Sequence, residues 1–263
     1  MGEQAVILAE ARRTAQATEG FPGEVPGDLA GAYAMQEAVI AKLGRPIRGW
    51  KVAMIHPDLR AGLGAERTTG PILQGSIITT DGSGTVRAPV FAGGACALEA
   101  EFAVVLGKEL SALDQMPDAT AIRDAIAGVH AGVEIASSPV PGIVELGPCA
   151  TTSDIGINAG AILGPEIADW DWSGSPESYV TRAWVGETLA GEGSAAAVPG
   201  GLIAAMEFLL TQLATRGRGL NAGDVVLTGM TNGVHKVRPG STMAIEFVGT
   251  VRMEIEVTAI QPS

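Results

Sequence analysis

From residue 46 onward, short apolar runs of strand-like length alternate with turn residues. These runs predict β-strands at residues 49–54, 72–78, 98–106, 129–136, 155–163, 179–185, 225–227, 242–247 and 250–257. Two helices interrupt them, predicted at residues 119–126 and 201–215. Because strands and helices do not alternate regularly, a doubly wound parallel sheet is disfavoured. The pattern predicts a mixed or antiparallel sheet in a protein of the α+β class.

The first 45 residues have a helical pattern instead. A short helix is predicted at residues 5–13, followed by a loop rich in glycine and proline. Asp28 is a good N-cap for a second helix that runs to about Leu43, where Gly44 and Pro46 end it. We therefore predict a helical N-terminal cap (residues 1–47) and a β-rich body (residues 48–263), either as two units or as one continuous domain.

Composition excludes several classes of function. The formal net charge of −12 argues against binding to nucleic acid and to anionic membranes. A hydrophobic fraction of 46% excludes intrinsic disorder. The two cysteines are too few for a disulfide framework, no run of 18 apolar residues predicts a membrane span, and the N-terminus does not resemble a signal peptide. We expect a cytoplasmic protein without a nucleic-acid or membrane partner.

The most informative segment is Leu-Glu-Ala-Glu-Phe at residues 98–102. In a strand, residues i and i+2 face the same side, so Glu99 and Glu101 project together. Glu134 ends a second apolar run and enters another strand. Three carboxylates on neighbouring strands form an all-oxygen site that suits Mg²⁺ or Mn²⁺. The alternative is that the Glu-x-Glu pair lies on a solvent-facing sheet edge.

Lys51 and the histidines are the other candidate site residues. Lys51 lies in a short apolar strand, where a lysine either extends to solvent from an edge or is buried beside acids. In the second case it could act as an acid, a base or an oxyanion partner. His56 and His130 are candidates for supporting roles near the site, although the pattern favours surface or structural roles for both. The spacing of the histidines does not fit a zinc motif.

An ordered set of short motifs resembles one family. The motifs are Ala32-Tyr33-Ala34-Met35-Gln36, Gly49-Trp50-Lys51-Val52, Gly70-Pro71-Ile72-Leu73, Glu99-Ala100-Glu101, Val133-Glu134-Ile135, residues 160–164, Thr228-Gly229-Met230-Thr231 and Val237-Arg238-Pro239-Gly240. Together they resemble the 2-keto-4-pentenoate hydratase / 4-oxalocrotonate decarboxylase group of the fumarylacetoacetate hydrolase superfamily. The resemblance extends from about residue 30 to residue 257.

This resemblance implies a mixed β-roll body with a helical N-terminal part. It also implies a divalent metal, Mg²⁺ or Mn²⁺, held by Glu99, Glu101 and Glu134, with Lys51 as the catalytic residue beside it. Carried over in the same way, the substrate-binding positions are Leu73, Gln74, Asp154 and Thr231. The implied substrates are 2-keto acids from the meta-cleavage of aromatic rings, whose carboxylate and 2-oxo oxygen chelate the metal.

The sequence departs from the group at several positions. Gln74 stands where an aspartate is common, Ser137 and Pro139 stand where the group has Asp and Arg, and Ile157 replaces a serine. Ile55-His56 follows Lys51 where a small polar pair is usual. The metal ligands and the lysine are retained, so these departures bear on the substrate and the reaction.

Four hypotheses follow from the resemblance. The first is a metal-dependent hydratase that adds water to a 2-hydroxy-2,4-dienoate and gives a 4-hydroxy-2-oxo acid. The second is decarboxylation of a 2-oxo-hexenedioate, for which Arg60 or Arg67 could hold the far carboxylate. The third is hydrolysis of a C–C bond in a fumarylpyruvate-type substrate, with His56 as the base. The fourth is a non-catalytic relative that binds a keto acid. In each case we expect a small-molecule ligand and a homo-oligomer.

Overall fold

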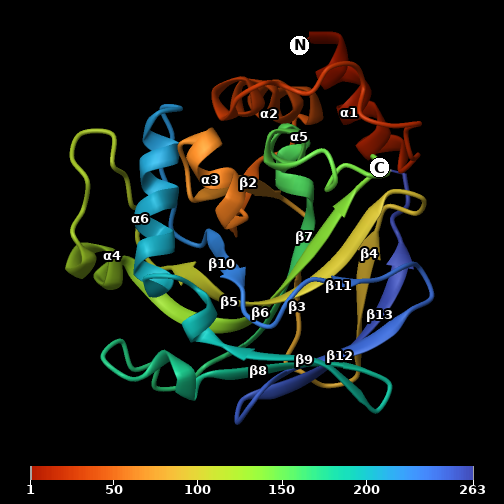
Figure 1. The fold of residues 1–263 in the computed structure, drawn as a ribbon. Coiled ribbons are helices and arrows are strands. Elements are labelled where there is room, and N and C mark those ends of the chain that lie inside the picture. The colour runs from red at the N-terminus through yellow and green to blue at the C-terminus, as the bar shows by residue number, and fades with distance from the viewer. Residues whose placement is uncertain (1, 263) are drawn as a thin grey trace.

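The computed structural model describes residues 2–262 (Figure 1). Its helices are α1 (Gly2–Thr14), α2 (Leu29–Leu43), α3 (Pro57–Leu63), α4 (Ala119–Ala125), α5 (Pro148–Ser153) and α6 (Gly201–Ala214). Its strands are β1 (Ile47–Met54), β2 (Arg67–Leu73), β3 (Ile77–Thr79), β4 (Thr85–Val90), β5 (Ala95–Leu106), β6 (Ile126–Ser138), β7 (Asn158–Glu166), β8 (Val180–Val185), β9 (Thr188–Ser194), β10 (Val225–Met230), β11 (His235–Lys236), β12 (Thr242–Phe247) and β13 (Val251–Ala259).

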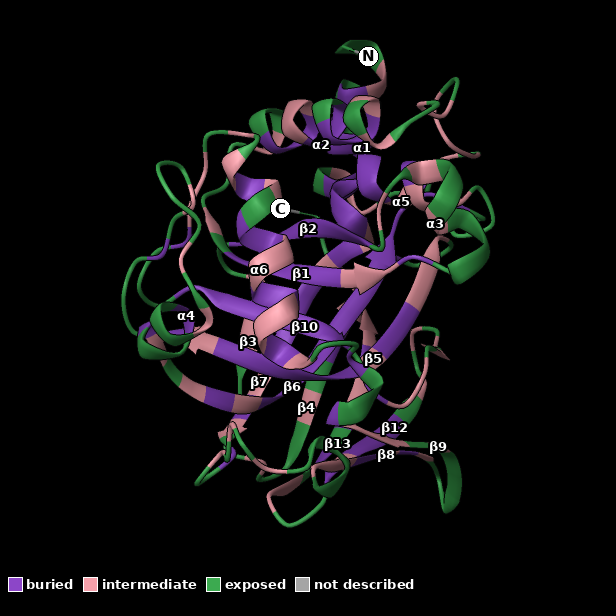
Figure 2. Cartoon of the chain, turned by 60° about the vertical axis from the view of Figure 1, so that its left-hand side comes forward, coloured by how far each residue is buried: buried purple, intermediate pink, exposed green. Residues whose placement is uncertain are grey.

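The strands form two sheets that share a core. The larger sheet has the order β2-β1-β10-β5-β6-β7-β3, and β11 also pairs with β5. The smaller sheet has the order β4-β13-β12-β8-β9. Phe102 of the larger sheet meets Phe247 of the smaller sheet edge to face, with ring centroids 5.4 Å apart. Figure 2 shows the strands of the larger sheet buried along most of their length. Both sheets mix parallel and antiparallel pairs, so the α+β class is confirmed.

Helix α6 packs on the core with one apolar face. Leu202, Met206 and Leu209 are among its buried residues, at the helical spacing that predicted it. By length and composition alone, the stretch Ala195–Ala214 could cross a membrane, and 39% of its most apolar window is buried inside the protein. A core helix passes the same test of length and apolarity, so this stretch is weak support for a membrane span.

The N-terminal helices form as predicted. The side chain of Asp28 accepts a hydrogen bond from the Gly31 backbone N–H and caps α2, which ends at Gly44 in the left-handed conformation that glycine favours. In Figure 1, α1 and α2 lie together above α5. Their buried residues form one cluster with side chains of the body such as Ile143 and Ile155. A division of the chain at residue 47 remains a prediction, and residue 1 lies outside the described chain.

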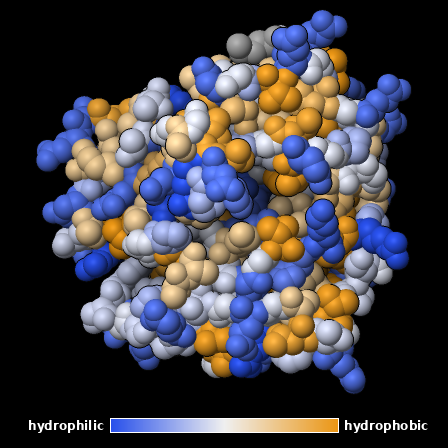
Figure 3. Space-filling model, viewed as in Figure 1, coloured by the Kyte–Doolittle hydropathy of each residue, from blue (hydrophilic) through white to orange (hydrophobic). Residues whose placement is uncertain are grey.

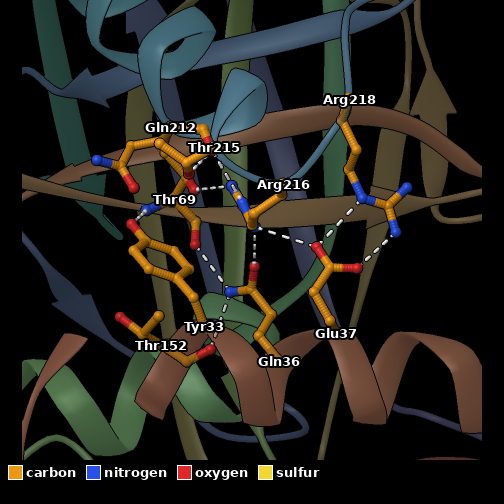
Figure 4. A network of polar contacts seen from close by, with 9 residues as sticks. All are labelled: Tyr33, Gln36, Glu37, Thr69, Thr152, Gln212, Thr215, Arg216 and Arg218. Atoms are coloured by element: carbon orange, nitrogen blue, oxygen red, sulfur yellow. Dashed lines mark hydrogen bonds and ion pairs between the residues drawn. The ribbon is translucent and has the colours of Figure 1, made fainter. Parts of the chain in front are cut away.

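A polar network ties α2 to β2 and to the end of α6 (Figure 4). Arg216 donates to Gln36 Oε1 at 2.8 Å and to Thr69 Oγ1 at 2.9 Å. Its guanidinium also lies over the rings of Tyr33 and Trp50. Since β2 pairs with β1, this network holds the strand that carries the candidate lysine.

A buried ion pair joins the first helix to the body. Arg12 makes a bidentate contact with Asp154, at 2.6 Å and 2.7 Å, and both side chains are almost fully buried. Arg12 also donates to the backbone oxygen of Asn158 at 2.9 Å. The pair therefore fixes the segment that leads from α5 into β7.

We expect Arg12→Met to lower the free energy of unfolding by about 3–5 kcal/mol, because it leaves the Asp154 carboxylate buried without a counter-charge. Urea unfolding measures the change. The matched control is Arg13→Met, since Arg13 pairs with Glu10 on the surface, where each side chain is about half exposed. That control should change the free energy by about 1 kcal/mol or less. Equal effects of the two substitutions on the free energy of unfolding would contradict a stabilising role of the buried ion pair between Arg12 and Asp154.

Several features of the secondary structure differ from the predictions. The strand expected at residues 72–78 is divided into β2 and β3, because Gly75 takes a positive φ of 81° in a turn. The strand expected from residue 155 begins at Asn158. The sequence patterns also did not predict β4 and β9, which are the edge strands of the smaller sheet. β4 contains a proline and β9 contains two glycines, and both residue types are unusual inside a strand.

Candidate metal centre

Strands β5 and β6 bring three glutamates together. Glu99 and Glu101 lie on one face of β5, and Leu98 and Phe102 are buried on the other. The antiparallel register places Glu134 of β6 directly opposite Glu99. One carboxylate oxygen from each of the three residues lies within 4.8 Å of the other two. Like charges directly opposite each other destabilise a sheet, and a bound proton or a nearby cation relieves the repulsion.

Lys51 supplies one positive charge from β1. Its Nζ lies 3.4 Å from Oε1 of Glu134, and both side chains are buried. Asn158 donates to the same Oε1 from its Nδ2 at 3.1 Å. The other oxygen, Oε2 of Glu134, is buried without a hydrogen-bond partner. A buried carboxylate oxygen without a partner costs free energy, and a hard dication beside it would satisfy it.

A bulge in β10 provides a further contact to the cluster. The pairing of β10 with β5 shifts between Leu227 and Met230. In this irregular stretch the Gly229 backbone N–H donates to Oε2 of Glu101 at 2.6 Å. The hydrogen bond orients one carboxylate of the cluster and favours its charged form. The three glutamates and their fixed orientation fit a Mg²⁺ or Mn²⁺ ion, which the sequence predicted.

The charges of the cluster perturb one another. Burial, and then the charges of Glu134 and Glu99, raises the pKa of Glu101 well above its usual value. Burial, and then the charge of Glu134, raises the pKa of Glu99 to about 7. Burial alone would lower the pKa of Lys51, but the three carboxylates outweigh it and raise that pKa. The lysine is therefore held in its charged form.

The raised pKa of Glu99 predicts a pH dependence. Its pKa rises from an ordinary value of 4.5 to about 7 in the metal-free fold, so the native state binds an additional proton between these values. The contribution of Glu99 to the free energy of unfolding of the metal-free protein should therefore fall as the pH rises from about 4.5 to about 7. Above pH 7 this contribution should stay constant. Because the ligands bind a metal in their deprotonated form, loss of the Glu99 proton should by itself raise the affinity for Mg²⁺ in the same range by up to about tenfold per pH unit.

Calorimetric titration of Mg²⁺ at several pH values checks this expectation. The Glu99→Gln variant is the control, because it lacks the titrating group. In this variant the affinity for Mg²⁺ should depend less on pH, by the part that Glu99 provides. An affinity that does not change below neutral pH would contradict the assignment.

A pocket of about 250 Å³ opens beside the cluster and contains Lys51 and Glu99 in its lining. Residues of α3, α5, β1 and the end of β10 form its walls. Figure 3 shows a hollow near the middle of the face seen in Figure 1, with both hydrophilic and hydrophobic side chains at its border. The volume suits a small organic ligand.

One wall of the pocket has an unusual backbone. Ile155, Gly156 and Ile157 all have positive φ values, of 45°, 68° and 54°. A β-branched residue rarely adopts this region, and such strain is found mainly at functional sites. Gly156 lies against Lys51, since a Cβ at this position would be 3.0 Å from Lys51 Cε. The segment thus confines the lysine side chain.

The structure does not bring the four predicted substrate-binding residues to this pocket. Leu73 lines a different pocket beside Arg45, and Gln74 is exposed, with its backbone oxygen bound by Arg45. Asp154 is occupied by Arg12. Thr231 is buried, and its hydroxyl contacts Thr181 and the Ala100 backbone oxygen.

The two histidines have different positions. His56 lines the pocket and lies 3.6 Å from Asp58, and both side chains are largely exposed. His130 contacts the Gly164 backbone oxygen through Nδ1 at 3.0 Å. Within residues 2–262, no hydrogen bond or ion pair links His130 to the glutamates.

Sequence reasoning missed several residues of the site. Asn158, Gly156 and Gly229 contact or confine the charged side chains, and Val144 and Met230 form part of the pocket wall. Gly229 and Met230 lie in the motif at residues 228–231, but the resemblance implied a substrate-binding role only for its last residue, Thr231. The other residues gave no signal, because their roles depend on contacts between distant segments.

One protein-family model and several solved structures resemble this chain. The model of the fumarylacetoacetate (FAA) hydrolase C-terminal family matches residues 71–258. A comparison with curated protein sequences gave no match. Among solved structures, the chain is similar to 4-oxalocrotonate decarboxylase from Pseudomonas putida G7 complexed with magnesium and adipate, with a TM-score of 0.76, 22% identity and 98% of each chain covered.

Two further structures are similar over less of the chain. One is fumarylpyruvate hydrolase from Pseudomonas aeruginosa in complex with Mn²⁺ and pyruvate, with a TM-score of 0.59, 14% identity, and 82% of this chain and 91% of that chain covered. The other is 2-hydroxyhepta-2,4-diene-1,7-dioate isomerase from Mycobacterium marinum, with a TM-score of 0.57, 19% identity, and 82% and 77% covered. At these identities the likeness establishes a shared fold, and the predicted β-roll fold is confirmed.

Proposed function

Because the chain belongs to the fumarylacetoacetate hydrolase family, we propose that it is a divalent-metal-dependent lyase. The proposed reaction is the addition of water to a 2-hydroxy-2,4-dienoate, or its 2-keto-4-enoate tautomer, to give a 4-hydroxy-2-oxo acid. The observation that carries the proposal is the position of Lys51, which lies among three glutamates at the wall of a small pocket. Glu101 and Glu134 are buried and Glu99 is half-buried.

The residues have separate roles in this reaction. Glu99, Glu101 and Glu134 would hold Mg²⁺ or Mn²⁺, which supplies Lewis-acid stabilisation of negative charge on the 2-oxo oxygen of the substrate. The ammonium of Lys51 adds a second positive charge in a buried setting, where electrostatic interactions are strong. As an ammonium, Lys51 could also donate a proton to a substrate carbon bound beside it.

The surroundings of the pocket favour hydration over decarboxylation of a dicarboxylate. A second carboxylate would require a cationic partner, for which Arg60 and Arg67 were candidates. Arg60 donates to the Ile55 backbone oxygen, and Arg67 binds the Pro199 backbone oxygen and the sulfur of Met54. Among the described residues, no arginine lines the pocket. A far carboxylate would therefore find no arginine, and the basic side chain of His56 already lies beside Asp58.

A specific observation supports C–C bond hydrolysis as a second candidate. His56 and Asp58 face each other at the pocket. A histidine beside a carboxylate is a suitable general base for the activation of water. Both side chains are largely exposed and their 3.6 Å separation exceeds a hydrogen bond, so we rank this reaction below hydration.

One set of assays separates the candidates. Purified protein with Mg²⁺ and 2-hydroxypenta-2,4-dienoate should remove the dienol absorbance, and NMR should identify 4-hydroxy-2-oxopentanoate. The control is the same protein treated with a chelator. Release of CO₂ from 2-oxohex-3-enedioate, without loss of the dienol, would support the decarboxylase instead. Pyruvate released from fumarylpyruvate, and lost in His56→Ala, would support the hydrolase. Binding of Mg²⁺ and pyruvate without turnover would indicate a non-catalytic relative.

A further inference from the structure

The lining of the pocket is largely apolar. Its large apolar side chains come from separated parts of the chain: the end of β1 with the residue after it, α3, the loop at residues 139–147, the segment before β7, and the end of β10 with the loop that follows it. They are Met54, Ile55, Leu59, Val144, Ile157, Met230 and Val234.

Four of these side chains are also unusually exposed. Leu59, Val144, Met230 and Val234 have exposed fractions of 41–51%. Exposed apolar residues scattered singly over a surface have no special meaning, but a group at the rim of a polar site indicates a ligand with an apolar part.

The pocket has few charged side chains in its lining. Within residues 2–262, Lys51 and His56 are the only basic side chains in its lining, and Lys51 is bound to Glu134. His56 faces Asp58. The remaining polar groups include the neutral hydroxyl-bearing residues Thr68 and Thr151. A ligand held at the glutamate end by its 2-oxo and carboxylate oxygens therefore extends along apolar side chains.

From this arrangement, and resting on the proposed function, we infer that the enzyme selects 2-keto acids with an uncharged apolar tail. The tail is an alkyl or aryl substituent at the end of the molecule far from the carboxylate. Leu59, Val144 and Val234 determine this specificity. Dicarboxylic 2-keto acids are poor ligands, because their second carboxylate loses water without gaining a partner.

Binding of saturated 2-oxo acids tests this inference without depending on turnover. The protein, loaded with Mg²⁺, is titrated by calorimetry with pyruvate, 2-oxooctanoate and 2-oxoadipate. Each buried methylene contributes about fourfold in affinity, so 2-oxooctanoate should bind at least about tenfold more tightly than pyruvate. The affinity for 2-oxoadipate should not exceed that for pyruvate.

A charge placed on the apolar wall should reverse the preference. In Val144→Arg, a guanidinium would face the far end of the ligand, and affinity for 2-oxoadipate should rise about tenfold. The matched control is Val248→Arg, which changes a similarly exposed valine in the hairpin between β12 and β13, outside this pocket. The control should leave all three affinities unchanged.

The outcomes distinguish this inference from the proposed function. If pyruvate binds with Mg²⁺ but the tail adds nothing, or if 2-oxoadipate binds best to the unmodified protein, the tail assignment is wrong and the proposed function stands. If pyruvate itself does not bind to the Mg²⁺-loaded protein, the proposed function fails and the tail assignment fails with it. If Val144→Arg changes only the oligomeric state, the apolar rim is an interface between subunits and the inference is overturned.

Discussion

Glu134→Gln is expected to weaken binding of Mg²⁺ or Mn²⁺ by about 100-fold or more and to abolish turnover. The amide has the shape of the carboxylate but no negative charge, and Oε2 of Glu134 is the buried oxygen that lacks a protein partner. Calorimetry measures the metal affinity, and the dienol assay measures turnover. The control is Glu166→Gln, which removes an exposed carboxylate on the neighbouring strand β7.

The same variant should not unfold the protein. Three glutamates with one lysine leave negative charge in excess, so removing one carboxylate should leave the thermal midpoint of the metal-free protein equal or higher. Addition of Mg²⁺ should raise the midpoint of the unmodified protein and leave that of the variant nearly unchanged. A variant that binds metal normally would contradict the ligand assignment.

Lys51→Met is expected to reduce turnover by about 10²–10⁴-fold while one metal site per chain remains. The substitution keeps an unbranched side chain in the buried position but removes the charge 3.4 Å from Glu134. Because an ammonium repels a nearby dication, affinity for Mg²⁺ should be equal or higher in the variant. Loss of activity with retained metal binding would separate a catalytic role from a structural one.

The matched control for Lys51→Met is Lys42→Met, which changes an exposed lysine at the end of α2. It should leave both turnover and metal affinity unchanged. Full activity in Lys51→Met would show that the lysine only balances the charge of the glutamates. Loss of metal binding in that variant would show that Lys51 is needed for the fold of the site.

Local patterns predicted the parts of the site that depend on a single element. The alternation of side chains in β5 predicted that Glu99 and Glu101 share a face, and the structure has this arrangement. The capping residue Asp28 and the end of α2 at Gly44 were also predicted correctly. In these cases the geometry follows from the strand or helix itself, so neighbouring residues are sufficient to predict it.

Contacts between distant segments could not be predicted in this way. The strand β10, from the last part of the chain, lies between the strands of Lys51 and Glu101, and its bulge aims the Gly229 N–H at a carboxylate. Asp154 was expected at the substrate, but it is bound by Arg12, which lies 142 residues earlier. Such pairings depend on sheet order and register, which periodicity does not encode.

Anomalous scattering from crystals grown with Mn²⁺ tests most directly whether the three glutamates hold a divalent metal. The account predicts one strong peak per chain, in contact with carboxylate oxygens of Glu99, Glu101 and Glu134 and close to Lys51. Absence of a peak at saturating Mn²⁺, or a peak bound only by other residues, would contradict it.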